Sequence, residues 1–259
     1  MLIALTRPVS STLGQCELTH LAREPIDVAR AMVEHRSYED TLATLGATIV
    51  RVPGDSSLPD AVFIEDTALV LDQAAVVTRP GASSRRPETQ SVAEVLARYR
   101  PLLRVEPPAT LDGGDVLPID RTIYVGLSTR TNLAGATQLG TLLRPLGYEV
   151  VSIKFTGCLH LKSAATRVGP SRVLLNPRWI LPTVFRGLDC LEVHPEEPAG
   201  ANALLLGGSV VYPSHFPRTA DRLATLGLRV HPVDTRELAK AEGGVTCCSL
   251  IFQEAASAA

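Results

Sequence analysis

The sequence predicts an α/β fold of repeated units in a single domain, and three observations lead to this class. One short pattern, in which a helix end and a stop precede a β-strand, recurs at residues 41–53, 142–151 and 223–232, and more weakly at 98–105 and 186–193. The stops fall near residues 46, 100, 147, 187 and 227, at intervals of about 40 to 54 residues. No linker divides the 259 residues. We therefore expect one domain over residues 1–254 and a frayed tail at 255–259.

Helical and β-rich segments alternate between these stops. Glycine suits the position just after a helix, because that position needs a left-handed backbone, which glycine adopts at little cost. Helical patterns precede most stops, at residues 28–46, 87–99, 131–147 and 216–227. The expected strands are the N-terminal run 1–8 and the β-rich runs 61–71, 74–78, 122–127, 172–175 and 203–212. Five copies of this alternation predict an α/β repeat architecture.

Five repeats can close radially around one axis, or they can stack as a solenoid. A closed ring places the loops of every repeat around one pocket, whereas a solenoid needs capping repeats and offers no single site. A doubly wound sheet is the least favoured arrangement, because no Gly-x-Gly-x-x-Gly pattern follows the first strand.

Composition and charge narrow the possible partners and location. The 25 basic and 27 acidic residues give a formal net charge of −2 and are spread along the chain, so nucleic acid is not an expected partner. No apolar run is long enough to span a membrane, and the N-terminus resembles a strand more than a signal peptide. The five cysteines are an odd number in a long chain, which favours reduced thiols and a cytoplasmic location.

Two acidic segments are candidates for a functional site. Glu65 and Asp66 lie in the apolar run 62–70, which we expect to be a strand, and buried carboxylates are costly unless they are paired or bind a cation. An acidic bend bonded to nearby amides is the alternative. Asp112 opens the turn Asp-Gly-Gly-Asp at 112–115, which has a carboxylate on either side of two glycines. An ordinary Asp-Gly turn explains it equally well.

Two further segments carry a histidine and a cysteine. His160 alternates with apolar residues, so we expect it in a strand, on the same face as Cys158 and Lys162. A single histidine in a strand is more often a core residue than a catalyst. Cys247 follows the pair Gly243-Gly244, and a buried cysteine is commonly only a small apolar side chain.

The sequence contains no pattern typical of a metal or nucleotide cofactor. Cys247 and Cys248 lack Cys-x-x-Cys spacing, and His160 has no histidine two or four residues away. A phosphate-binding loop and a Gly-x-Ser-x-Gly elbow are also missing. We expect no metal and no cofactor.

Together these segments resemble the dimethylarginine dimethylaminohydrolases, a family within the guanidine-modifying superfamily that includes arginine deiminases and amidinotransferases. The resemblance extends from about residue 7 to residue 252. It rests on the blocks at 13–15, 27–31, 57–60, 63–66, 78–86, 111–117, 125–132, 160–163 and 246–249. The family fold is a five-bladed α/β propeller with pseudo-fivefold symmetry, so the resemblance favours the closed ring.

The resemblance implies roles for the candidate residues. Cys247 is the implied nucleophile and His160 the implied acid and base. Asp112 and Asp66 are expected to hold a guanidinium group, with Glu65 beside them. The remaining substrate contacts are implied for Arg85 and Arg130, which match carboxylate-binding arginines, for Leu18, at a lid position, and for Glu242, where the family more often has Asp.

The sequence position of the two adjacent cysteines distinguishes their expected roles. The nucleophile of the family follows a Gly-Gly-x-Thr/Ser turn, and the first cysteine, Cys247, matches it. In an extended segment the next residue points to the opposite face, so we expect Cys248 to be a structural thiol.

The implied activity is hydrolysis of Nω-methylated arginines to citrulline plus methylamine or dimethylamine. An arginine deiminase is the nearest alternative, although the chain has no room for the large helical insertion of the bacterial deiminases. A ligand-binding relative without catalysis is an alternative of a different class. The expected partner is a small-molecule substrate, and a homodimer is the assembly considered.

Overall fold

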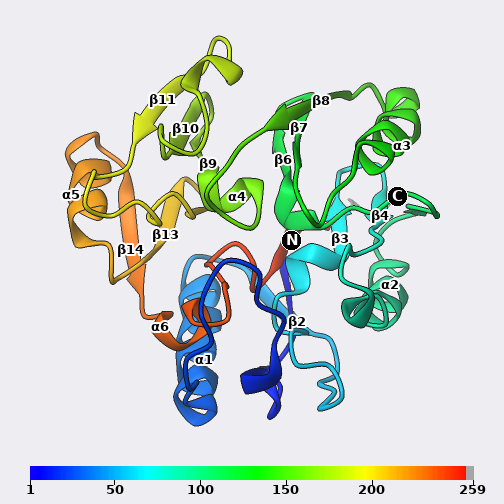
Figure 1. Cartoon of the computed structure of the whole chain (residues 1–259), viewed down its shortest axis with the longest axis horizontal. Coiled ribbons are helices and arrows are strands. Elements are labelled where there is room, and N and C mark those ends of the chain that lie inside the picture. The colour runs from blue at the N-terminus through cyan, green and yellow to red at the C-terminus, as the bar shows by residue number, and fades with distance from the viewer. Residues whose placement is uncertain (255–259) are drawn as a thin grey trace.

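The structure is a computed structural model that describes residues 1–254. Within these residues the strands form five three-stranded sheets. Figure 1 shows the sheets placed around a common centre, with helices on the outside. The α/β class predicted from alternating segments is therefore confirmed. The predicted frayed tail, 255–259, lies outside the described residues.

The five sheets share one internal order. In each, the middle strand pairs antiparallel with one neighbour and parallel with the other. In sheet order the strands are β15 (Leu250–Gln253), β1 (Leu2–Thr6) and β2 (Thr48–Arg51); β3 (Ala68–Val70), β4 (Ala75–Val77) and β5 (Leu102–Arg104); β6 (Val116–Ile119), β7 (Thr122–Leu127) and β8 (Glu149–Lys154); β9 (Ala165–Gly169), β10 (Arg172–Leu175) and β11 (Asp189–Glu192); β12 (Leu204–Leu206), β13 (Ser209–Pro213) and β14 (Arg229–Val233).

Helices connect most of the parallel strand pairs, because parallel neighbours need a crossover connection. The helices are α1 (Val28–Thr44), α2 (Glu88–Leu96), α3 (Leu133–Leu143), α4 (Leu161–Ala164), α5 (Pro217–Thr225) and α6 (Arg236–Ala239). Four of them, α1, α2, α3 and α5, join the middle strand of a sheet to its parallel partner. Between β10 and β11 the described chain has only a short 3₁₀ turn. No helix in residues 1–254 is both long and apolar enough to cross a membrane.

Most predicted stops have the expected backbone. Gly46 follows α1 with φ 94°, and Gly227 follows α5 with φ 81°. Gly147 and Gly187 are also left-handed, with φ of 80° and 77°. The copy near residue 100 differs, because α2 ends at Leu96 without a left-handed residue after it.

Three local predictions were wrong. Only Ala68–Val70 of the run 61–71 is a strand, and residues 64–67 form a 3₁₀ helix. His160 does not lie in a strand but immediately precedes α4. The segment 245–248 is a turn rather than an extended strand end. In each of these segments a buried polar side chain, Asp66, His160 or Cys247, has a polar partner that the alternation of apolar residues does not reveal.

The two ends of the described chain share one sheet. Strand β15 pairs antiparallel with β1 over Leu250 to Gln253, so the C-terminal strand lies beside the N-terminal one. Next to this sheet, the hydroxyl of the fully buried Tyr38 on α1 lies 2.7 Å from Ser249 Oγ. This contact anchors the segment that carries Cys247 against the first helix.

Candidate active site

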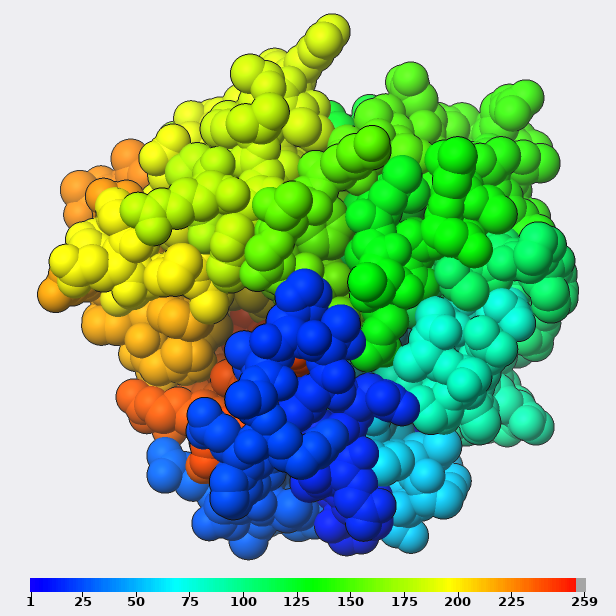
Figure 2. Space-filling model, in the orientation of Figure 1, coloured from blue at the N-terminus to red at the C-terminus, as the bar shows by residue number. Residues whose placement is uncertain are grey.

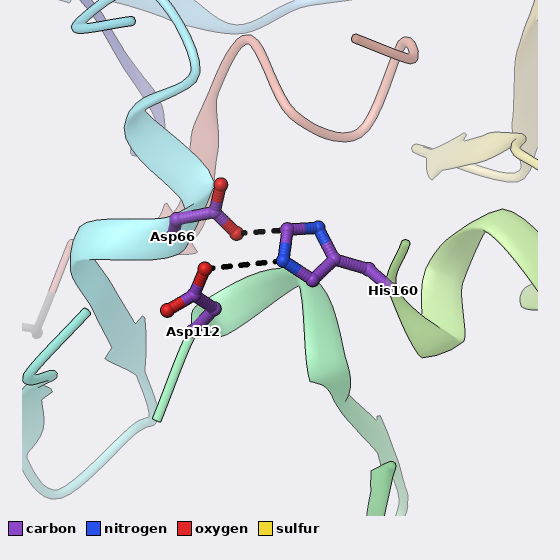
Figure 3. Close-up of side chains that lie close together, drawn as sticks. All are labelled: Asp66, Asp112 and His160. Carbon is purple, nitrogen blue, oxygen red and sulfur yellow. Dashed lines mark hydrogen bonds and ion pairs between the residues drawn. The ribbon is translucent and has the colours of Figure 1, made fainter. Parts of the chain in front are cut away.

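Three polar side chains meet at the centre of the five sheets. His160 Nε2 lies 3.1 Å from Asp112 Oδ2, and His160 Nδ1 lies 3.8 Å from Asp66 Oδ1 (Figure 3). All three residues are buried. They come from different sheets, so residues up to 94 positions apart in sequence converge at this point.

These residues occupy similar places in their repeats. Asp66 lies just before β3, Asp112 before the 3₁₀ turn that leads into β6, and His160 before the short helix that leads into β9. Asn202 precedes β12, and Cys247 precedes β15. Each sheet thus contributes a side chain from the turn that enters its first strand.

The buried histidine and carboxylates of the cluster shift the pKa values of one another toward the charged forms. Burial lowers the pKa of His160, but Asp66, Asp115 and Asp112 outweigh it and raise the pKa to about 9. Burial works against the ionised form of Asp66, but His160 and Arg85 outweigh it and lower the pKa of this carboxyl to about 2. At neutral pH the cluster therefore holds an imidazolium beside the ionised carboxylate of Asp66.

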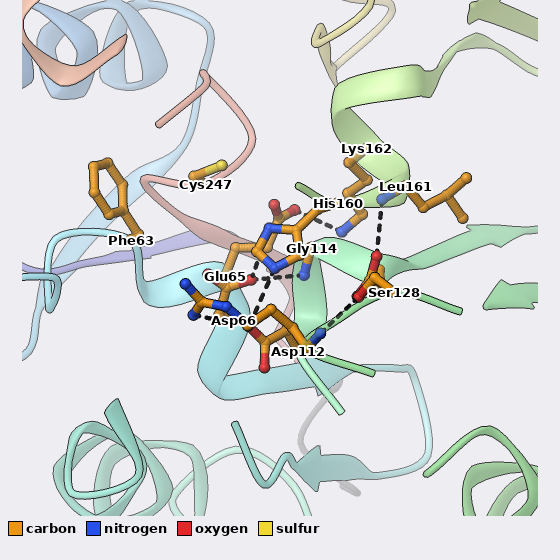
Figure 4. A network of polar contacts seen from close by, with 12 residues as sticks. Phe63, Glu65, Asp66, Asp112, Gly114, Ser128, His160, Leu161, Lys162 and Cys247 are labelled. Carbon is orange, nitrogen blue, oxygen red and sulfur yellow. Dashed lines mark hydrogen bonds and ion pairs between the residues drawn. The ribbon is translucent and has the colours of Figure 1, made fainter. Parts of the chain in front are cut away.

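Cys247 lies beside this cluster. Figure 4 shows its side chain together with those of Asp66 and His160, and all three line the same small cavity. The Cys247 Sγ accepts a hydrogen bond from the Gly244 amide at 3.3 Å. Burial raises the pKa of the Cys247 thiol to about 12, and the charges of Glu65 and Asp66 act in the same direction. The thiol is therefore neutral at pH 7 unless a cation comes to lie next to it.

Cys248 has different surroundings. It is 1% exposed, does not line the cavity, and packs in the apolar cluster that includes Tyr38 and Val245. Burial raises the pKa of its thiol well above the ordinary value. These contacts agree with the separation of the two cysteines that the sequence predicts, although the local backbone is a turn rather than a strand.

The cavity beside Cys247 has a volume of about 20 Å³, space for roughly one water molecule. Residues 16–27, which contain no helix or strand and are called the covering loop here, lie over it. Figure 2 shows the N-terminal part of the chain, in blue, across the middle of this face. The residues that line the cavity are Glu17, Asp60, Phe63, Asp66, Arg85, Arg130, Leu159, His160, Ala241, Glu242 and Cys247.

Glu242 holds the covering loop in place. Its carboxylate accepts hydrogen bonds from the backbone amides of Thr19 (3.1 Å), His20 (2.5 Å) and Leu21 (2.7 Å). Its own backbone is left-handed, with φ 59°. The residue predicted to contact a substrate amino group thus bonds to the loop above the cavity that it lines.

Arg130 also contacts this loop. Its Nη2 donates to Thr19 Oγ1 at 3.1 Å, and its Nη1 lies 3.9 Å from Asp112 Oδ2. Leu18, the predicted lid residue, is half-buried and packs on the apolar cluster beneath the loop. Of these two residues, Arg130 lines the cavity and Leu18 does not.

Arg85 is buried among carboxylates. Its Nη1 donates to Asp66 Oδ2 at 2.5 Å, and its Nη2 donates to Glu88 Oε2 at 2.8 Å. Carbonyl oxygens of Asp60 and Phe63 accept further hydrogen bonds from Nη2. Arg85 lines the cavity as predicted, but its guanidinium also fixes the orientation of Asp66.

Glu65 has a different place from the one expected. One of its carboxylate oxygens accepts from Lys162 Nζ at 2.6 Å, and the other accepts from Thr246 Oγ1 at 2.7 Å. Its backbone amide donates to the Cys247 carbonyl at 3.1 Å. Glu65 does not line the cavity in this structure, and its contacts support the turn of Cys247; its binding of substrate stays a prediction.

Sequence reasoning gave no role to three residues that shape the site. Asp60 is buried, lines the cavity and accepts hydrogen bonds from the Glu17 amide. Asp115 accepts from the Leu161 amide at 2.9 Å and from Ser128 Oγ at 2.6 Å, and so fixes the backbone next to His160. The amide of Asn202 bonds to Thr246. The signal that could have identified Asn202 is its position before the first strand of its sheet.

The cluster of Asp66, Asp112 and His160 is also the place where a cation could bind. Their ligand atoms all lie within 4.8 Å of one another. A protonated imidazole has no free lone pair for a metal, and the pKa of His160 is about 9. The arrangement therefore favours an organic cation that donates hydrogen bonds to the two carboxylates.

Comparison with known proteins identifies the family. Residues 19–178 match the sequence profile of the eukaryotic N,N-dimethylarginine dimethylhydrolases. The N(G),N(G)-dimethylarginine dimethylaminohydrolase of Pseudomonas aeruginosa is 35% identical over 247 residues, which cover 95% of this chain and 96% of the relative. The chain belongs to the dimethylarginine dimethylaminohydrolase family. The family member of Streptomyces coelicolor is 42% identical, with 97% of each chain covered.

Solved structures of the dimethylarginine dimethylaminohydrolase family have the same fold. A cysteine-to-serine variant of the P. aeruginosa protein, complexed with citrulline, superposes with a TM-score of 0.92 at 33% identity and covers 96% of this chain and 98% of that one. The N-terminal domain of a cyanobacterial arginine dihydrolase superposes with a TM-score of 0.87 at 18% identity, covering 98% of each chain, and shows the fold alone. The resemblance predicted from the sequence is confirmed.

Proposed function

We propose that this chain hydrolyses Nω-methylated arginines, namely asymmetric dimethylarginine and monomethylarginine, to citrulline plus dimethylamine or methylamine. Such an enzyme is a cysteine hydrolase that acts on C–N bonds of linear amidines. The observation that carries the proposal is the cavity that Asp66, His160 and Cys247 line together, with Asp112 Oδ2 3.1 Å from His160 Nε2 behind it. Membership of the family, through relatives of 35% and 42% identity along almost the whole chain, supports the same activity.

Asp66 and Asp112 bind the guanidinium group in this proposal. A guanidinium is planar and cationic and donates hydrogen bonds in its plane, a geometry that carboxylates accept well. Its arrival adds a positive charge beside Cys247, whose pKa is raised in the structure by burial and by Glu65 and Asp66. The cation offsets these effects, so the substrate itself promotes formation of the thiolate.

The reaction then proceeds in two halves. The Cys247 thiolate bonds to the central guanidinium carbon, and the C–N bond to the methylated nitrogen breaks as His160 gives its proton to that nitrogen. The neutral amine leaves, and the carbon remains bound to sulfur as a thiouronium. Neutral His160 next takes a proton from water, and the hydroxide adds to the carbon. The C–S bond breaks as the added hydroxyl gives its proton to the sulfur, which leaves citrulline and the neutral thiol. The imidazolium is restored, and the thiol proton passes to solvent when the next substrate binds.

The amino-acid end of the substrate lies beneath the covering loop. Arg85 and Arg130 are the proposed partners of its carboxylate, and Leu18 contributes to the cover. Glu242 and Asp60 line the cavity and supply negative charge near its amino group. Because Glu242 already accepts three amides of the loop, we propose that it acts on the substrate chiefly by keeping this loop closed.

We further propose that the five sheets form a five-bladed α/β propeller with pseudo-fivefold symmetry, as a single catalytic domain over residues 1–254. The shared strand order of the sheets and the equivalent positions of the site residues support this description. We place the protein in the cytoplasm, since all five cysteines are free and the reaction needs a reduced thiol. Its proposed partner is the small-molecule substrate, and a homodimer stays a prediction for light scattering to check.

A citrulline assay tests the proposed function. Purified protein is incubated separately with asymmetric dimethylarginine, monomethylarginine and arginine, and Cys247→Ser protein is the control. Citrulline from the two methylated compounds and little from arginine supports the proposal. Turnover of arginine alone would identify a deiminase, and no turnover of any of the three would favour a ligand-binding relative.

A further inference from the structure

A second and larger cavity lies next to the proposed active site. Its volume is about 380 Å³, compared with about 20 Å³ for the cavity that Cys247 lines. His20 and Leu21 of the covering loop form part of its wall, as do Trp179 and Phe216. The mechanism above makes no use of this space.

The wall between the two cavities is thin. Leu159 and Glu242 line both of them. Gly243 lines the larger cavity, and a Cβ added to it would lie 2.1 Å from the ring of Phe63, which lines the smaller one. Gly244, also in the larger wall, donates its amide to Cys247 Sγ at 3.3 Å. One glycine pair therefore separates the larger cavity from the nucleophile.

Thr235 and His215 line the larger cavity, and each has a buried polar side-chain atom without a hydrogen-bond partner. Within the described part of the chain, these atoms are Thr235 Oγ1 and His215 Nδ1. Thr235 is 1% exposed. Burial and the charge of Arg236 lower the pKa of His215, so its imidazole is neutral at physiological pH and one ring nitrogen can accept a hydrogen bond. Buried polar atoms are normally satisfied, so this pair indicates a bound donor.

The first half of the reaction creates a need for such a space. When the amine is released, the amino-acid part of the substrate is still bonded to Cys247 and occupies the cavity under the covering loop. That cavity measures only about 20 Å³, so it has to enlarge even to hold the amino-acid part of the substrate and offers little space for a departing molecule. The amine must move away from His160 before water can reach the thiouronium carbon.

The chemistry of the larger cavity suits a methylated ammonium ion. A released alkylamine is a stronger base than imidazole and takes a proton from solvent. It then carries apolar methyl groups, one positive charge and two or three N–H donors. The cavity offers the aromatic residues Trp179 and Phe216, the carboxylate of Glu242, and the acceptors Thr235 and His215. Aromatic faces and a few acceptors are the groups that recognise such cations.

We propose that this cavity is a binding chamber for the methylammonium or dimethylammonium ion on its way out of the active site. The inference rests on the proposed function, because that function supplies the amine.

Trp179 makes the chamber directly observable. It is the single tryptophan of the chain, so the indole N–H signal in an NMR spectrum reports on the chamber alone. Dimethylammonium chloride is titrated into Cys247→Ser protein saturated with citrulline, which fills the substrate cavity. Potassium chloride at the same ionic strength is the control for salt. We expect a saturable shift of the indole signal that potassium does not produce.

Two variants connect the signal to the chamber. Thr235→Val removes the unpaired hydroxyl with little change in volume, and we expect it to weaken dimethylammonium binding about fivefold or more. Thr141→Val, on the distant helix α3 with an exposed side chain, should leave the affinity unchanged. Because Thr235 is buried, a circular dichroism melt of each variant is compared with that of the wild type to check folding. His215→Phe removes the second unpaired acceptor and should also weaken dimethylammonium binding.

The outcomes are separable from those of the proposed function. A response that citrulline abolishes would place the amine in the substrate cavity and overturn the chamber. The lack of a saturable response would also overturn the chamber. Equal affinity for dimethylammonium in the folded Thr235→Val, His215→Phe and parent proteins would do the same. The same titration on the protein without citrulline detects the chamber even if no substrate is turned over. Failure of the citrulline assay would reject the proposed function alone.

Discussion

His160 Nε2 lies 3.1 Å from Asp112 Oδ2, and both side chains are buried. The contact joins the second of the acidic turns to the residue that precedes α4. It also contributes to the raised pKa of His160, in which burial acts downward and Asp66, Asp115 and Asp112 act upward. The acid of the proposed mechanism is therefore kept protonated by the carboxylates that bind the substrate cation.

Asp112→Asn should lower the pKa of His160 from its value of about 9, because the amide keeps a hydrogen-bonding group but removes a charge. NMR titration of the imidazole carbon–proton signals measures the midpoint directly. His231→Gln, which removes a half-buried histidine of β14 outside the site, helps to assign the signals. An unchanged midpoint in Asp112→Asn would show that Asp66 and Asp115 alone hold the proton.

The same raised pKa predicts how stability depends on pH. A histidine whose pKa rises from 6.5 to about 9 on folding stabilises the protein fully below pH 6.5, and this contribution is lost as the pH rises through 9. The loss is on the order of 3 kcal/mol in the free energy of unfolding. Urea unfolding at pH 6.5 and pH 9.5 measures it. His160→Gln should show a clearly smaller decrease than the wild type, and an equal decrease would contradict the assignment.

Cys247→Ser should reduce citrulline formation by a factor on the order of 10³ or more, because a hydroxyl is a far weaker nucleophile than a thiolate. Cys248→Ala is the matched control from the next position. It removes a thiol that packs near Tyr38 and does not line the cavity, so activity should stay within about tenfold of the wild type. Equal losses in the two variants would reverse the choice between the cysteines.

Glu242→Gln should loosen the covering loop. Hydrogen bonds to a charged acceptor contribute about 1.5 to 3 kcal/mol, so the amides of Thr19, His20 and Leu21 should exchange with deuterium at least about tenfold faster. Hydrogen–deuterium exchange mass spectrometry measures the peptide that contains them. Glu196→Gln, at an exposed ion pair with Arg218, is the control and should leave exchange in this peptide unchanged. Equal protection in both variants would mean that other contacts hold the loop.

The elements of this fold were predictable where a local pattern fixes them. Helix α1 was placed within two residues of its observed bounds, because Asp27 caps its start and Gly46 follows its end. Strands β7 and β10 were placed exactly as observed, since each is a short apolar run beside a turn. The closure of the chain through β1 and β15 joins segments at opposite ends of the sequence, so periodicity could not indicate it.

The site was less accessible to sequence reasoning. Residue types in four segments suggested chemistry, but each segment had an ordinary explanation, and only the family resemblance connected them. Glu65 and Asp66 are adjacent in sequence, yet the 3₁₀ turn directs one to Lys162 and the other to His160. The contact of Glu242 with the loop depends on packing across more than 200 residues. Such contacts follow from the arrangement of the sheets and not from spacing along the chain.

The last prediction concerns Arg85, which can act as a structural cation, as a ligand for the substrate carboxylate, or as both. Its guanidinium is buried against Asp66 and Glu88, and removal of one partner from a buried ionic network typically costs about 3 to 5 kcal/mol. Arg85→Ala should therefore lower the free energy of unfolding by about this amount. Arg86→Ala, which removes a half-buried neighbour bonded to the Pro80 carbonyl, should cost only about 1 kcal/mol.

Urea unfolding of Arg85→Ala and Arg86→Ala, together with the KM for dimethylarginine, distinguishes the roles of Arg85. Arg85→Lys keeps a charge near Asp66 but loses the two-pronged donor geometry, so it should recover part of the stability. If Arg85 also binds the substrate, the KM of this lysine variant stays raised even though its fold is restored. A KM equal to that of the wild type would leave Arg130 as the arginine that holds the carboxylate and would confine Arg85 to the orientation of Asp66.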